Sequence, residues 1–341
     1  MGIYKFRICE RKDRQMLVDF IDKYWKKDHI LVRSKEILDF QYYNREEDNY
    51  TFLLAENQET GEIDGIRGWI RVAQYDSALA PFDDVWSAVW KVRTDVQNNE
   101  IKLLGSYLGR YLNKHKGFGT VGISKFSYAM HTALRHVMCS LNQYYILNPD
   151  TRNYKIANIK TPVQAPKVGV TSSDFHLINI DDILQISDLE VPAYYRPFKS
   201  ITYLYNRFQK HPVYKYYFHG VQSANGLECV LVSKFVEVNG SKVIRIVDVL
   251  GSLENVGNLY DEFVRLLRIS NSEYVDFLCY GVGEEIFDRM GFKKLDTESG
   301  NIIIPNYFEP FLQQNIVING AYKAADNYVM FKADADQDRP S

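Results

Sequence analysis

Hydrophobic and polar positions alternate along this chain in short blocks, each with the period of a strand or of a helix. In the first 147 residues, period-two runs predict strands at residues 4–9, 50–56, 63–72, 85–92, 120–123 and 143–147. Runs with the helical period predict helices at residues 16–24, 34–41, 101–112 and 126–137. Ser34 is the expected N-cap of the second helix, because its hydroxyl can accept a free N–H of the first turn.

The second half repeats this order of elements. Helices are expected at residues 181–185, 199–210, 253–269 and 284–290, and strands at residues 214–221, 228–238, 243–250 and 274–279. Between residues 148 and 168 the periodicity fades and prolines accumulate, which indicates a linker. The pattern therefore predicts an α/β fold of two tandem domains, residues 1–155 and 156–341. Each is expected to be a mixed, mostly antiparallel sheet flanked by helices.

Charge narrows the range of partners. The chain has 341 residues with 41 Lys and Arg against 43 Asp and Glu, so it lacks the basic excess of a nucleic-acid-binding protein. Its apolar runs have the length of strands, and its start lacks a signal-peptide core, so we expect a cytoplasmic protein without membrane insertion. Four scattered cysteines suggest free thiols in a reducing compartment. The oligomeric state stays open.

Tyrosine is unusually frequent, at 25 residues. Its ring is large, stiff and amphipathic, and such rings often line ligand clefts or interfaces. Most of these tyrosines are nevertheless expected in the core.

One segment carries a family resemblance. A predicted strand, a glycine-containing turn, a helix and a second strand precede residues 286–292, which read Ile-Phe-Asp-Arg-Met-Gly-Phe. This order resembles the core of the GCN5-related N-acetyltransferase superfamily, whose last helix typically ends in Gly-Phe. The physical reason is a helix C-cap, in which Gly291 takes the left-handed conformation and Phe292 packs back. An unrelated αβ crossover can also end in this way.

Further segments narrow the resemblance to tandem acyltransferases of bacterial surface-polysaccharide clusters. They lie at residues 25–31, 34–42, 88–93, 142–148, 196–200, 211–216 and 305–311. The chain resembles sugar N-acyltransferases that transfer a 3-hydroxybutanoyl group from CoA to dTDP-3-amino-3,6-dideoxygalactose. The resemblance implies acyl-CoA and a nucleotide-linked amino sugar as substrates, and a role in O-antigen or lipopolysaccharide biosynthesis.

The resemblance also implies a place for CoA. In this superfamily the pyrophosphate lies on the N-terminus of the helix that follows the fourth strand, where free N–H groups favour anions. In the first half that region offers six candidate cofactor-binding residues: Val92, Arg93, Asn98, Asn99, Ile101 and Lys102.

The family pattern has glycines in this loop, whereas here none lies between Arg93 and Gly105. Asn98 and Asn99 tolerate left-handed geometry, so a working turn and a decayed loop are equally good interpretations. The second half has better glycines, but Glu254 lies where phosphate would bind. We therefore favour the first half for CoA.

Two histidines are candidate catalytic residues. Alignment of the last helix places His131 where the family often has a tyrosine that protonates the leaving thiolate. His29 lies in the region that caps the acceptor site and is a candidate base for the amine. An ordinary helix histidine and a backbone-bonded loop histidine are the alternatives, and base rates favour them.

Candidate substrate-binding residues come from the second half. Arg196 and Lys199 are expected to clamp a nucleotide pyrophosphate while Tyr195 stacks on the base, or else to begin a solvated helix. Asn306 and Tyr307 are expected to line the sugar pocket or to close the second domain. No motif indicates a metal site.

Two rival functions stay open. The same tandem fold serves aminoacyl or peptidoglycan-directed transferases that use charged tRNA, although the missing basic surface counts against that function. A non-catalytic binding module with a degenerate CoA loop is the other.

Overall fold

The computed structural model describes residues 2–161, 174–192, 195–324 and 327–335. In the first half, strands and helices follow the order that the hydrophobic pattern predicts, with a short helix at residues 30–33 and a short strand at residues 43–44 in addition. The strands are β1 (Tyr4–Glu10), β2 (Tyr43–Asn44), β3 (Asn49–Asn57), β4 (Ile63–Arg71), β5 (Asp84–Val92), β6 (Gly117–Val121) and β7 (Val137–Leu147). The helices are α1 (Arg14–Phe20), α2 (Ile30–Arg33), α3 (Lys35–Tyr42), α4 (Ile101–Tyr111) and α5 (Lys125–Ala133).

The second half repeats the plan with more short strands. Its helices are α6 (Ile201–Leu204), α7 (Tyr260–Ser270) and α8 (Glu284–Met290). Its longer strands are β9 (His176–Ile180), β11 (Tyr217–Ser223), β12 (Gly226–Val238), β13 (Ser241–Gly251), β14 (Tyr274–Tyr280) and β19 (Ile318–Lys323). The short strands are β8 (Asn158–Ile159), β10 (Tyr195–Arg196), β15 (Lys293–Lys294), β16 (Ile302–Ile303), β17 (Tyr307–Phe308), β18 (Phe311–Leu312), β20 (Asn327–Tyr328) and β21 (Met330–Phe331).

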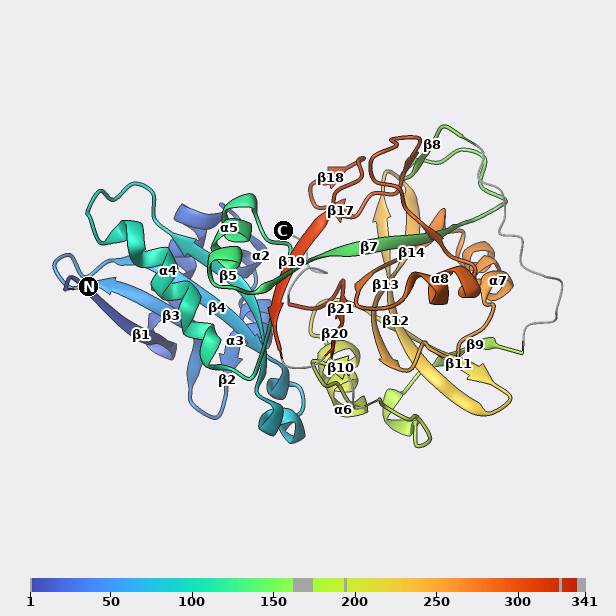
Figure 1. Cartoon of the computed structure of the whole chain (residues 1–341), viewed down its shortest axis with the longest axis horizontal. Coiled ribbons are helices and arrows are strands. Elements are labelled where there is room, and N and C mark those ends of the chain that lie inside the picture. Colours follow the sequence, from blue (N-terminus) through green and yellow to red (C-terminus); the bar gives the residue numbers. More distant parts are fainter. Residues whose placement is uncertain (1, 162–173, 193–194, 325–326, 336–341) are drawn as a thin grey trace.

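One mixed sheet runs through both halves. Its strands follow the order β1-β3-β4-β5-β6-β19-β7-β14-β13-β12-β11-β9. Figure 1 shows the first half at one end of the long axis and the second half at the other, with β19 and β7 between them. This mostly antiparallel mixed sheet with flanking helices confirms the predicted fold class.

The two halves exchange strands at the centre of the sheet. The first part of β7, residues 137–141, pairs with β19, whereas its second part, residues 142–147, pairs with β14. Conversely, β19 belongs to the last part of the chain but lies between β6 and β7. Each half therefore contributes a strand to the sheet of the other, and the division of the chain after residue 155 stays a prediction.

A shared hydrophobic core covers one face of the sheet. It combines side chains of α1, α3 and α6 with strand residues of both halves, such as Val89 and Phe218. On the other face the halves have separate cores. Leu104 and Leu108 of α4 pack in the first, and Phe263 of α7 packs in the second. The common core joins the halves through burial of apolar side chains as well as through strand pairing.

Local capping signals in the sequence are confirmed. The hydroxyl of Ser34 accepts the N–H of Ile37 at 3.2 Å at the start of α3. Gly291 ends α8 with a φ of 93°, and the N–H of Phe292 donates to the carbonyl of Phe287 at 2.9 Å. Phe292 is buried, so the next apolar residue does pack back as the C-cap requires.

The predicted helix at residues 126–137 is too long. Helix α5 ends at Ala133, Arg135 takes a left-handed φ of 61°, and β7 begins at Val137. The predicted strand at residues 143–147 therefore starts too late. Pairing with β19, almost two hundred residues away in the chain, extends β7 backwards.

Helix predictions in the second half also need correction. Helix α7 begins only at Tyr260, whose N–H donates to Asn258 at 2.9 Å, and residues 253–259 are irregular. The predicted helix at residues 181–185 is a single 3-10 turn, Ile183–Gln185. The helix expected at residues 199–210 consists of α6 and a π-helical turn, Tyr205–Gln209.

Part of the predicted linker, residues 155–157, is bonded to the second half. The Glu273 carboxylate accepts the backbone N–H groups of residues 155–157, and Ile156 is fully buried in a small core. The rest of the predicted linker, from residue 162, lies outside the described residues. Among the described helices, none is long and apolar enough to cross a membrane.

Candidate functional site

The parallel strands β5 and β6 diverge at the centre of the first half. They pair from Asp84 with Gly117 to Ser87 with Thr120. β6 then ends at Val121, while β5 continues to Val92. The divergence leaves the end of β5 beside the turn that leads into α4.

A pocket of about 910 Å³ lies at this end of β5, and we call it the first-half pocket. Its walls come from β5, the turn at residues 93–100, and helices α4 and α5. All six predicted cofactor-binding residues line it: Val92, Arg93, Asn98, Asn99, Ile101 and Lys102. Trp25, Trp90, Phe126 and Met130 add an apolar wall.

Arg93 is already neutralised by carboxylates. Its guanidinium donates to Asp95 at 3.0 and 3.1 Å, to Glu62 at 2.5 Å and to Asp64 at 3.2 Å. The pKa of Arg93 is raised chiefly by the hydrogen bonds to Asp95. Its charge is therefore shared among three acidic residues, and its role as a cofactor-binding residue stays a prediction.

Two lysines at the first-half pocket keep their charge free. Lys102 is exposed in the first turn of α4, and Lys91 is half-buried on β5. Within the described parts of the chain, neither ammonium has a carboxylate partner. Lys91 was missed by sequence reasoning, although a lone charge near the end of an apolar strand run was a usable signal.

Asn98 holds the turn that leads into α4. Its Oδ1 accepts the N–H of Ile101 at 2.7 Å, and its Nδ2 donates to the Tyr4 hydroxyl at 3.0 Å. Neither Asn98 nor Asn99 has a positive φ, so this turn forms without the left-handed geometry that we considered. A pocket wall is thus built without the family's glycines.

His131 lies behind the pocket rather than in it. Its ring is 1% exposed and packs against Trp90, and it is not among the described residues that line the pocket. Its Nδ1 lies 2.8 Å from Nδ1 of His136, whose Nε2 lies 2.8 Å from the Asn113 amide oxygen.

These contacts define the tautomers. The Asn113 oxygen accepts, so His136 carries its proton on Nε2 and accepts at Nδ1 from His131. Burial lowers the pKa of His131 to about 3 and that of His136 to about 4. His131 is therefore neutral at physiological pH, and this geometry does not support its expected role as an imidazolium proton donor.

His29 caps a helix. Its Nδ1 accepts the N–H of Leu31 at 3.2 Å at the start of α2, and its ring is 2% exposed. In neutral imidazole this leaves the proton on Nε2, so Nδ1 is occupied and not available as a base. The ring packs against Trp25, 4.5 Å between centroids, and Trp25 lines the pocket. His29 thus supports the pocket wall from behind.

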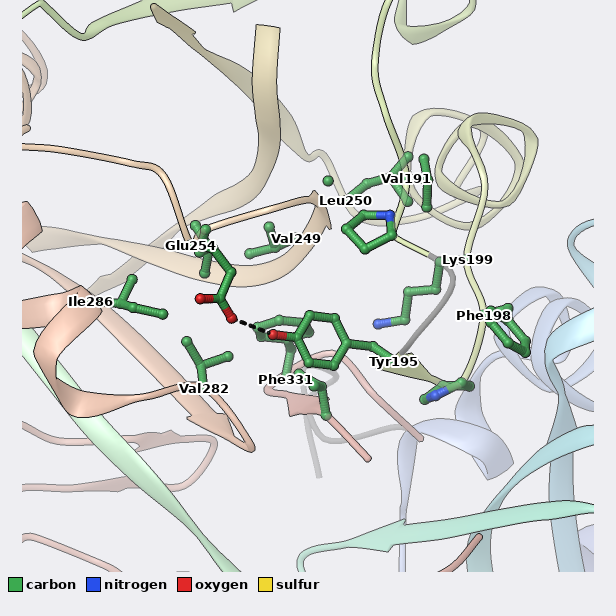
Figure 2. A pocket seen from close by; sticks show the side chains of 15 residues that line it. Val191, Tyr195, Phe198, Lys199, Val249, Leu250, Glu254, Val282, Ile286 and Phe331 are labelled. Atoms are coloured by element: carbon green, nitrogen blue, oxygen red, sulfur yellow. Dashed lines mark hydrogen bonds between the residues drawn. The ribbon is translucent and has the colours of Figure 1, made fainter. Parts of the chain in front are cut away.

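The equivalent divergence in the second half is filled by the chain itself. β13 and β14 pair from Ile244 with Val275 to Ile246 with Phe277. Beyond that point β21 pairs with β14, and the N–H of Ala333 donates to the Val247 carbonyl at 2.9 Å. The space that remains, the second-half pocket, measures about 60 Å³. Figure 2 shows it, with Phe331 among the residues that line it.

Arg196 and Lys199 are not free to clamp a pyrophosphate. Arg196 holds the Asp84 carboxylate of β5, with Nη2 at 2.6 Å from Oδ1. The Lys199 ammonium is 6% exposed and lies 2.6 Å from Asp248 and 2.8 Å from Asp334. Both cations join distant parts of the chain, so their predicted substrate role is not supported by these contacts.

The other predicted substrate residues are dispersed. The Tyr195 hydroxyl donates to Glu254 at 2.9 Å across the second-half pocket, as Figure 2 shows. Asn306 is buried and donates to the Ile316 carbonyl at 2.7 Å. Tyr307 packs under the Lys332 ammonium at 5.2 Å. None of the three lines the first-half pocket.

Other chemistry is sparse in the described regions. Those regions contain no group of three or more His, Cys, Asp or Glu residues that could hold a metal ion. All four cysteines are buried free thiols, and burial raises the pKa of Cys139 to about 12. The thiols are therefore poor nucleophiles.

Comparison with known proteins shows which solved structures share this fold. No protein-family model matches the sequence, and a search of curated proteins finds no match. A GCN5-related N-acetyltransferase from Anabaena variabilis matches with 7% identity and a TM-score of 0.51, over 86% of this chain and 70% of that one. A conserved protein of unknown function from Enterococcus faecalis matches with 8% identity and a TM-score of 0.50, over 93% and 71%.

A third solved structure is Saccharomyces cerevisiae N-myristoyltransferase with bound myristoyl-CoA. It matches with 9% identity and a TM-score of 0.44, over 100% of this chain and 86% of that one. At such identities the likeness concerns the fold alone. The chain has the fold of the GCN5-related N-acetyltransferases.

Proposed function

We propose that this protein is an acyl-CoA-dependent N-acyltransferase that acts on the amino group of a nucleotide-linked sugar. The observation that carries the proposal is the first-half pocket, which opens where β5 and β6 diverge in an acyltransferase fold. The acyl group (3-hydroxybutanoyl), the sugar (dTDP-3-amino-3,6-dideoxygalactose), the cytoplasmic location and the role in surface-polysaccharide biosynthesis rest on the sequence resemblance.

The residues of the first-half pocket fit CoA chemically. The wall of Trp25, Trp90 and Met130 suits the apolar parts of a pantetheine chain. Lys91 and Lys102 offer free ammonium groups to phosphate oxygens. The second-half pocket, at about 60 Å³, has no such room, so we assign CoA to the first half.

The proposed reaction needs little from side chains. The amine nitrogen forms a bond to the thioester carbonyl carbon, the carbon–sulfur bond breaks, and the amine proton leaves as the thiolate gains one. Positioning of the two reactants supplies much of the rate enhancement in such a step. His29 and His131 both lie behind the pocket wall, so we assign them no proton transfer.

Calorimetry with CoA and thiol release from acyl-CoA test this proposal. We expect CoA to bind and thiol to appear only when a dTDP-amino sugar is present, with 3-hydroxybutanoyl-CoA among the donors. The Lys91→Ala variant should bind CoA more weakly, whereas Lys5→Ala, an exposed change on β1, should not. No CoA binding would instead favour a non-catalytic module. Binding without turnover on any amino sugar would refute the acceptor class.

A further inference from the structure

Arg67 of β4 is a buried cation without a counter-ion among the residues that the structure describes. Its side chain is 1% exposed, and its guanidinium lies 4.2 Å from the centre of the Trp90 ring and 5.9 Å from that of Phe118. No described residue accepts a hydrogen bond from its Nε or Nη2. Burial lowers the pKa of Arg67 to about 9, so it is still charged at neutral pH.

The two unpartnered nitrogens form one edge of the guanidinium. Nε–H and Nη2–H point the same way and match the two oxygens of a carboxylate. In the described part of the chain, four other arginines use this same edge to hold an aspartate. The pairs are Arg93 with Asp95, Arg196 with Asp84, Arg245 with Asp276, and Arg268 with Asp150. Within the described chain, the edge of Arg67 has no such partner.

The titratable groups closest to Arg67 supply no negative charge. His131 and His136 lie close enough to Arg67 that its charge helps to lower the pKa of both rings. Lys323 adds a further positive charge near His136. A cation in such a place is costly unless it is paired and hydrogen-bonded.

Arg67 does not itself line the first-half pocket but lies next to a residue that does. Trp90 lines this pocket, and its ring contacts the guanidinium. Met130 of α5 lines the same pocket one residue before His131. A group that enters from the pocket has to displace the Trp90 ring to bind Arg67.

We propose that Arg67 is the binding site for a ligand carboxylate that enters through the first-half pocket. The carboxylate belongs either to the far end of the acyl chain of the thioester or to a free organic acid. The first source rests on the proposed acyl-CoA-dependent function but replaces the 3-hydroxybutanoyl group by the acyl group of a dicarboxylic acid. The second source does not depend on it.

Thermal unfolding of the full chain in sodium acetate and in sodium chloride, at equal ionic strength, tests the site itself. Acetate should raise the unfolding temperature of the wild type above its value in chloride, since binding to the folded state stabilises it. Arg67→Met should lose the difference, whereas Arg110→Met, an exposed change on α4, should keep it. An acetate effect that survives in Arg67→Met, or that chloride matches in the wild type, overturns the proposal.

Binding of succinyl-CoA and butanoyl-CoA distinguishes the two sources. If the acyl chain carries the carboxylate, succinyl-CoA should bind the wild type about tenfold more tightly, and Arg67→Met should remove the preference. An Arg67-dependent acetate effect without this preference assigns the site to a free acid. Failure of CoA itself to bind refutes the proposed function and leaves the acetate result standing.

A measurement on the wild type covers the case in which Arg67→Met does not fold. A carboxylate on Arg67 accepts hydrogen bonds from its Nε–H and Nη2–H beside the Trp90 ring. Acetate at pH 7 should therefore shift the NMR signals of the Arg67 Nε–H and of the Trp90 ring, relative to chloride at equal ionic strength. Unchanged signals overturn the proposal.

Discussion

Ala333 donates its backbone N–H to the carbonyl of Val247, so the C-terminal segment bonds to β13 where β13 leaves β14. In the first half the corresponding stretch of β5 borders an open pocket. The halves thus share a fold and differ in what lies between the diverging strands. In the second half, β21 and Ala333 lie between the diverging strands.

Lys199 stabilises this arrangement through two buried carboxylates. Its ammonium bridges Asp248 and Asp334, which are both almost fully buried. Lys199→Met leaves two carboxylates together without a cation and should cost about 3–5 kcal/mol of the free energy of unfolding. Urea denaturation measures this loss. Lys210→Met, at an exposed position, is the control and should change stability by less than about 0.5 kcal/mol.

The order of strands and helices was predictable because it depends on local periodicity. Ser34 and Gly291 mark helix ends through chemistry within a few residues, and both predictions hold. The beginning of β7 was not predictable in this way. Residues 137–141 are a strand because β19 pairs with them, and nothing near Val137 in the sequence shows that.

In the candidate site, too, local features were predictable from the sequence and long-range contacts were not. That Val92, Asn98 and Lys102 lie at one pocket was predictable, because their places follow from one strand and the next helix. The pairing of Arg93 with Glu62 and that of Arg196 with Asp84 were not foreseen. Those contacts join residues that lie far apart in the sequence, and they decide whether a cation is free.

Buried neutral histidines should make stability depend on pH. Burial lowers the pKa of His131 to about 3, and of His136 and His219 to about 4, against ~6.5 in the unfolded chain. Below that unfolded value the unfolded state binds more protons, so the free energy of unfolding falls as the pH falls. The slope should approach ~1.4 kcal/mol per pH unit for each ring between pH 6 and pH 4.5.

Urea denaturation at several pH values measures this slope. His219→Gln removes one of the three groups and should reduce the slope by about a third, since the other two rings are unchanged. A free energy of unfolding that stays constant from pH 7 to pH 5 would contradict the assignment of these rings as neutral.

Two glycines of α4 should respond differently to substitution. A Cβ at Gly105 meets only Val92, at 4.0 Å, whereas one at Gly109 meets the Trp90 ring at 2.7 Å. Gly105→Ala should raise the free energy of unfolding by ~0.5–1 kcal/mol through helix propensity. Gly109→Ala should lower it by ~1–3 kcal/mol through overpacking.

The same position tests the pocket. Gly105 lines the first-half pocket, so Gly105→Trp should place a large ring inside it and weaken CoA binding strongly while Gly105→Ala leaves binding nearly unchanged. Calorimetry with each variant, after a check of folding by circular dichroism, measures the effect. Equal affinities for both variants would place CoA elsewhere.

The contrast between Lys91 and Arg93 separates a binding charge from a structural one. Lys91 has no carboxylate partner among the described residues, whereas Arg93 contacts three. Lys91→Ala should weaken CoA binding about three- to tenfold and reduce its dependence on salt, because one ammonium–phosphate attraction is lost.

Arg93→Met should instead lower the free energy of unfolding by ~1–2 kcal/mol, because it leaves the buried Asp64 carboxylate without a cation. Calorimetry between 50 and 300 mM salt, together with urea denaturation of each variant, measures both effects. The opposite pattern, with Arg93→Met affecting only CoA binding, would show that phosphate displaces its carboxylates.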